Sequence, residues 1–87
     1  MIDYTLYNLN SEDLDFLKML YADVENQNEI YLLFGDKSFV LEPSGEEIKI
    51  YAYGETLGYF DTLDDALLNF KFCDKTFIEL IPHLDFA

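Results

Sequence analysis

The stretch from residue 29 to residue 60 constrains the fold of this chain more than any other, because apolar and polar residues alternate there in four short runs. Segments rich in turn-forming residues separate the runs at 34–37, 42–46 and 53–56. Successive side chains of a β-strand point to opposite faces, so this pattern predicts half-buried strands joined by hairpins. We therefore expect a four-stranded antiparallel meander over about residues 29–60.

The lengths of the three connections test whether the four runs can share one buried face. We place a two-residue loop at 35–36, an even-numbered loop at 44–45 or 43–46, and a type II′ turn at 54–55. An odd loop at the second turn would mix apolar and polar residues on each face. The three registers agree on one buried set, which consists of Ile30, Leu32, Phe39, Leu41, Ile48, Ile50, Ala52, Leu57 and Tyr59.

These loops also set particular cross-strand neighbours. The second loop opposes Leu41 to Ile48 and brings Glu42 against Glu47, a like-charge pair that costs a few tenths of a kcal/mol or somewhat more. The third turn opposes Ala52 to Leu57.

A helical period precedes the predicted sheet. Leu14, Leu17, Leu20 and Tyr21 recur at helical spacing, and either Asn10 or Ser11 can cap the first turn. We expect an N-terminal helix over about residues 11–23.

The helical period returns after the predicted sheet. Leu63, Ala66, Leu67 and Phe70 form one apolar stripe, which predicts a helix over about 62–72 with its N-cap at 61 or 62. Asp74 can cap a short last helix over about 75–81, which Pro82 then ends. Residues 2–9 and 83–87 alternate weakly, so both segments remain candidates for short extended strands.

The charge balance excludes several classes of function. The 87 residues suit one domain and carry 18 acidic residues against 5 lysines, with no arginine and a formal net charge of −13. Direct contact with nucleic acid or with an anionic membrane surface needs a basic face, so we expect neither. The single cysteine indicates a cytoplasmic protein, and the arginine-free composition favours a bacterial or phage source.

The sequence offers little support for catalysis. His83 is the only histidine and Cys73 the only thiol, and the acidic residues Asp74 and Asp85 that flank this pair do not favour a reactive thiolate. One Cys and one His do not make a zinc site, and the acids at 61–65 lack the spacing of a calcium loop and suit a helix N-terminus instead. We expect no enzyme, no cofactor and no metal.

The second face of the predicted sheet is rich in aromatic residues. If the helices cover the Ile/Leu face, this surface looks outward, unless a helix or the N-terminal segment lies on it. Tyrosine-rich surfaces of small domains often contact other proteins. Its members are Tyr31, Leu33, Val40, Lys49, Tyr51, Tyr53 and Phe60, and our candidate protein-binding residues are Tyr31, Lys49, Tyr51, Tyr53 and Phe60.

We therefore predict a small acidic protein-binding or regulatory module whose partner is an unidentified protein with a basic surface. In a narrower version its carboxylates mimic the phosphates of nucleic acid and occupy a nucleic-acid-binding protein. The candidate acidic patch is Glu42, Glu46, Glu47, Glu55, Asp61, Asp64 and Asp65. The alternative is a structural or accessory homo-oligomer that buries the tyrosine-rich face.

Overall fold

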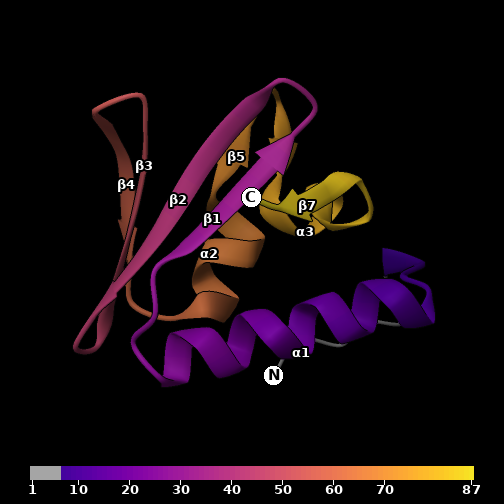
Figure 1. Cartoon of the computed structure of the whole chain (residues 1–87), viewed down its shortest axis with the longest axis horizontal. Coiled ribbons are helices and arrows are strands. Elements are labelled where there is room, and N and C mark those ends of the chain that lie inside the picture. The colour runs from indigo at the N-terminus through magenta and orange to yellow at the C-terminus, as the bar shows by residue number, and fades with distance from the viewer. Residues whose placement is uncertain (1–6) are drawn as a thin grey trace.

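The structure is a computed structural model that describes residues 7–87. It is an α+β fold in which a five-stranded antiparallel sheet has the strand order β4-β3-β2-β1-β7, and helices pack on one face of that sheet (Figure 1). The helices are α1 (Ser11–Glu25), α2 (Leu63–Asn69), α3 (Phe77–Leu80) and the 3₁₀ helix η2 (Ile81–His83). The sheet strands are β1 (Ile30–Phe34), β2 (Lys37–Ser44), β3 (Glu47–Ala52), β4 (Glu55–Phe60) and β7 (Leu84–Phe86), and β5 (Lys71–Phe72) and β6 (Lys75–Thr76) form a separate hairpin.

The predicted fold class is confirmed, and the C-terminal tail adds a strand to the predicted meander. β7 pairs antiparallel with β1 and sets Phe86 opposite Leu32. The ring of Phe86 stacks on Phe16 of α1 at a centroid distance of 4.5 Å. The candidate strand at residues 2–9 lies mostly outside the described residues.

Helix α1 begins where a cap was expected. The side chain of Asn10 accepts a hydrogen bond from the Asp13 amide at 2.8 Å, and the Asp13 carboxylate accepts one from the Asn10 amide at 3.1 Å. This reciprocal capping box satisfies two N–H groups that lack helical partners. The helix extends two residues beyond its predicted end and buries Leu17 and Leu20.

The C-terminal helices are shorter than predicted. Helix α2 is capped by Thr62 and ends at Asn69, because Phe70 turns extended (φ −72°, ψ 127°) and buries its ring in the core. The chain then forms the β5–β6 hairpin around 73–74, two residues with positive φ. Thr76, not Asp74, precedes α3, and the Glu79 carboxylate accepts hydrogen bonds from the amide and the hydroxyl of Thr76.

The first hairpin has the predicted register, and the second is shifted by two residues. Ile30 faces Leu41 as expected, but the second loop is 45–46, so Leu41 faces Ile50 rather than Ile48. A shift of two leaves every side chain on its predicted face. It also sets Glu42 opposite Lys49 instead of Glu47, which replaces a like-charge neighbour by an opposite charge.

The third hairpin departs from the prediction. Its turn residues are Tyr53 and Gly54, both at positive φ as a type I′ turn requires, and the register slips at a β-bulge after this turn. Phe60 therefore faces Ile48 and packs on the core, whereas Leu57 and Tyr59 are 39% and 58% exposed. The expectation that Leu57 and Tyr59 are buried and Phe60 points outward was wrong, because one inserted residue reverses the two faces of β4.

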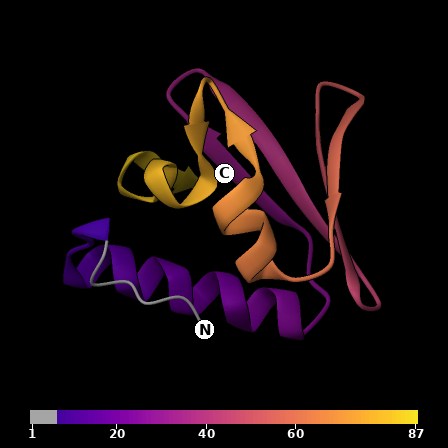
Figure 2. The same ribbon diagram turned by 180° about the vertical axis from the view of Figure 1, so that it is seen from behind.

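The core lies between the helices and the face of the sheet that we call the inner face (Figure 2). Phe39 of β2 is fully buried there, with the rings of Phe70, Phe72 and Phe77 at centroid distances of 5.0 to 5.5 Å. The helices thus occupy one side of the sheet, and the opposite side, the outer face, bears the partly exposed residues.

Candidate functional site

The outer face carries a group of tyrosines that no described helix covers. Tyr31 of β1 and Tyr51 of β3 flank Val40 across the sheet, and Tyr59 of β4 pairs with Lys49. We call Tyr31, Lys49, Tyr51, Tyr53 and Tyr59 the tyrosine face. Tyr31, Tyr53 and Tyr59 are 52%, 74% and 58% exposed, so more than half of the surface of each residue is available for contact.

A single carboxylate joins two of these tyrosines. The Tyr31 hydroxyl donates to Glu29 Oε2 at 2.7 Å, and the Tyr51 hydroxyl donates to the same oxygen at 3.5 Å. The hydrogen bond and the negative charge of Glu29 raise the pKa of Tyr31, and desolvation followed by the Glu29 charge raises the pKa of Tyr51. Both hydroxyls therefore remain protonated donors at neutral pH.

Lys49 and Tyr53 of the tyrosine face also make side-chain contacts. Lys49 Nζ lies 5.3 Å from the centroid of the Tyr51 ring, a cation–π contact, and the Tyr53 hydroxyl accepts a hydrogen bond from the Ser38 amide at 3.0 Å. The face is thus a partly ordered surface of aromatic rings with one lysine.

The structure brings together four of the five residues predicted to bind protein. Tyr31, Lys49, Tyr51 and Tyr53 share the outer face, but Phe60 lies on the inner side, with its ring 6.1 Å from that of Phe70. Sequence reasoning missed Tyr59. The signal was Gly58, because a glycine inside a strand pattern often marks a bulge.

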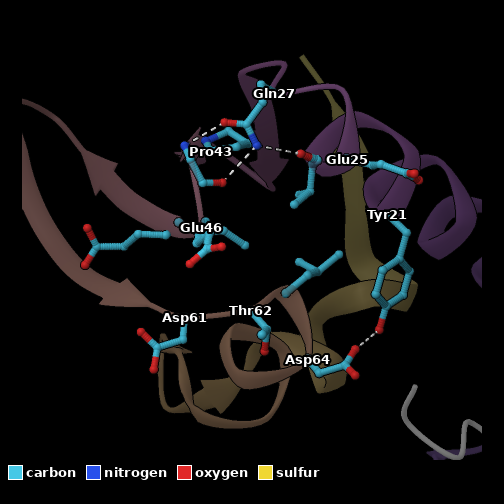
Figure 3. Close-up of a pocket in the computed structure, with 13 residues that line it drawn as sticks. Tyr21, Glu25, Gln27, Pro43, Glu46, Asp61, Thr62 and Asp64 are labelled. Carbon is cyan, nitrogen blue, oxygen red and sulfur yellow. Dashed lines mark hydrogen bonds between the residues drawn. The ribbon is translucent and has the colours of Figure 1, made fainter.

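A second feature is a groove of about 420 Å³ between the end of α1, the β2–β3 turn and the start of α2 (Figure 3). Four members of the predicted acidic patch line this groove, namely Glu46, Glu47, Asp61 and Asp64, and Glu25 adds a fifth acid. The other members do not line the groove. Glu42 lies on the outer face, Glu55 is the first residue of β4 and pairs with Ala52, and Asp65 lies in the first turn of α2.

Hydrogen bonds connect the walls of the groove. The Gln27 side chain accepts from the Gly45 amide at 2.7 Å and donates to the Gly45 carbonyl at 3.2 Å, which ties the end of α1 to the β2–β3 turn. The Tyr21 hydroxyl donates to Asp64 and so joins α1 to α2. Figure 3 shows Tyr21 and Asp64 facing each other at one side, whereas the carboxylates of Glu25 and Asp61 point outward from the rim.

The residues weighed for catalysis lie apart from both features. Exposed Cys73 accepts a hydrogen bond from the Lys37 ammonium at 3.5 Å, and the His83 ring packs edge-on against Phe34. Within residues 7–87, no group of three or more His, Cys, Asp or Glu side chains is arranged to hold a metal ion. None of the helices described is long and apolar enough to cross a membrane.

Comparison with known proteins adds no family to this description. No protein-family model, curated protein or solved structure matches the chain.

Proposed function

We propose that this chain is a non-enzymatic protein-binding module that docks a basic partner on the tyrosine face. The observation that carries the proposal is the exposure of Tyr31, Tyr53 and Tyr59 on a side of the sheet that no helix within residues 7–87 covers. Tyrosine supplies a large contact area and a hydroxyl at the cost of two side-chain torsions, and it is enriched among the residues that dominate binding energy.

The charges around the tyrosine face favour a basic partner. Glu29 binds the Tyr31 hydroxyl, Glu42 pairs across the sheet with Lys49, and Asp85 pairs with Leu33 of β1. The outer face thus carries three carboxylates and one ammonium. A partner with a positive patch is steered toward such a surface, and a net charge of −13 extends this attraction beyond the contact itself.

Docking of a protein fits the distribution of acids better than mimicry of nucleic acid. A mimic needs its carboxylates arranged along one surface, as phosphates are along a strand. Of the seven predicted acids, four line the groove, and Glu42, Glu55 and Asp65 lie elsewhere. We place the function in the cytoplasm, because a single cysteine suits a reducing compartment.

The experiment compares two matched double variants as baits in an extract of the source cell. Tyr31→Ser/Tyr59→Ser removes two exposed rings from the tyrosine face, and Met19→Ser/Leu68→Ser removes two side chains of α1 and α2 that are 53% and 42% exposed. We expect the unmodified chain and the helix variant to retain the same basic protein and the tyrosine variant to lose it. Equal retention by both variants would refute docking on the tyrosine face.

Repeating the capture at low and high salt separates the two contributions to binding. Charge-led attraction weakens as the Debye length falls from about 10 Å at 0.1 M to about 3 Å at 1 M salt, whereas burial of the rings does not. A partner retained at high salt therefore depends mainly on the aromatic rings. One released at high salt depends mainly on the acids.

Self-assembly through the same face is the alternative function. The position of β4 at the edge of the sheet favours it. Leu57 and Tyr59 of this strand are exposed, and no other strand of the described part of the chain pairs with its outer backbone edge. Sedimentation at micromolar concentration decides between the two functions. A strict monomer excludes a stable homo-oligomer, and a dimer that Tyr31→Ser/Tyr59→Ser dissociates supports it.

A further inference from the structure

We propose that the groove beside the β2–β3 turn is a docking site for a lysine side chain in an exposed basic segment of another protein. The groove lies at the helix side of the sheet end and shares no residue with the tyrosine face. The inference therefore stands independently of docking on that face.

The apolar part of the groove suits the stem of a long side chain. Val24 of α1, Pro43 of β2, Ile48 of β3 and Leu63 of α2 line it, and all but Val24 are buried. A lysine stem of four methylenes can cover such a surface while its ammonium stays at the hydrated rim.

The charged part of the groove suits the ammonium. Five carboxylates line the groove, and none of the five lysines does. An ammonium held at the rim therefore lies near several negative charges. The stem of the lysine would contact the apolar lining of the groove, and its ammonium would lie beside the carboxylates. This complementarity selects lysine over neutral or acidic side chains.

The groove is held in shape before any ligand enters. Gln27 clamps the β2–β3 turn to α1 through two hydrogen bonds with Gly45, and Tyr21 clamps α1 to α2 through Asp64. A site that is already formed avoids part of the entropy cost of ordering it. Its volume of about 420 Å³ is at the small end of ligand sites, which fits one side chain with its adjoining backbone rather than a folded element.

The test is an NMR titration of the isotope-labelled chain with three capped peptides at pH 6.5 and low salt. The lysine probe is Gly-Lys-Gly-Lys-Gly. Its matched controls replace both lysines by norleucine, which keeps the stem without charge, or by diaminobutyrate, which keeps the charge on a stem shorter by two methylenes. The Gly45 and Thr62 amides report on the groove, and the Tyr53 amide reports on the tyrosine face.

We expect the lysine peptide to shift the signals of Gly45 and Thr62 but not that of Tyr53. The norleucine peptide should not bind, and the diaminobutyrate peptide should bind about threefold more weakly or worse, because it loses contact with the apolar lining. Equal binding of the norleucine peptide would overturn the role of charge. Equal binding of the diaminobutyrate peptide would overturn the role of the lining.

Two charge-matched variants exclude a general effect of acidity. Glu46→Gln/Asp61→Asn removes two charges from the groove, and Glu55→Gln/Asp74→Asn removes two charges from turns away from it. We expect the groove variant to weaken lysine-peptide binding about five- to ten-fold and the control to change it less than about twofold. Equal weakening by both would show that the peptide senses net charge alone and would refute a site in the groove.

A third variant separates this inference from the proposed function. Tyr31→Ser/Tyr59→Ser should leave binding of the lysine peptide at the groove unchanged. Loss of peptide binding in this variant would mean that the groove is not an independent site.

Discussion

Because the faces of β4 are reversed, we expect Phe60 to contribute more to the free energy of unfolding than Tyr59. Sequence reasoning alone would predict the opposite order. Phe60→Ala removes a ring that packs on Phe70 at 6.1 Å and covers Gly58, where an added Cβ would lie 3.0 Å from the ring. Replacing a buried phenylalanine by alanine costs about 3–5 kcal/mol, and because Phe60 is only partly buried we expect a loss of about 2 kcal/mol. Tyr59→Ala removes a ring that is 58% exposed, so we expect a loss below about 1 kcal/mol.

Urea unfolding of the two variants at one salt concentration measures this difference. A chain of 87 residues has a free energy of unfolding of about 4–13 kcal/mol, so both variants should remain folded and give complete transitions. The midpoint should fall further for Phe60→Ala than for Tyr59→Ala, with similar slopes. A Tyr59→Ala variant that is destabilised as much as Phe60→Ala would refute the bulge and with it the membership of Tyr59 in the tyrosine face.

Three further predictions concern the cap, the tyrosine hydroxyls and the net charge. Asn10→Ala removes the capping box of α1 and should lower the free energy of unfolding by about 1 kcal/mol, measured by urea unfolding, whereas Asn10→Ser should restore most of it. The raised pKa of Tyr31 means that the unfolded chain loses this proton first, so stability should fall as the pH rises through and above 10. Ultraviolet titration should show Tyr31 ionising at lower pH after Glu29→Gln, and an unchanged titration would contradict the role of Glu29. Added salt should raise the melting temperature, because it screens repulsion among charges that sum to −13, and a flat salt series would exclude substantial self-repulsion.

Local patterns were sufficient where neighbouring residues alone decide the structure. The Gly35-Asp36 loop and the first hairpin register follow from alternation and turn chemistry, and the N-cap of α1 from the polar residues before the helix. The second hairpin kept its predicted faces despite a shift of two residues, because any even shift preserves them. Because the faces were preserved, the sequence was sufficient to predict that Tyr31, Lys49, Tyr51 and Tyr53 share the outer face.

Tertiary packing decided the remainder. The bulge in β4 places Phe60 on the core and Tyr59 outside, and the choice depends on the distant ring of Phe70. Helix α2 stops early because Phe70 is buried as the chain turns extended, and β7 exists because β1 offers an edge. The groove needs three elements far apart in sequence to meet.

Sequence by itself therefore determined which residues alternate and where the chain can turn, because these depend on bonds and neighbours along the chain. Only the folded structure decided which side of β4 is buried and which acids share a groove, because those outcomes depend on side chains that meet only after folding.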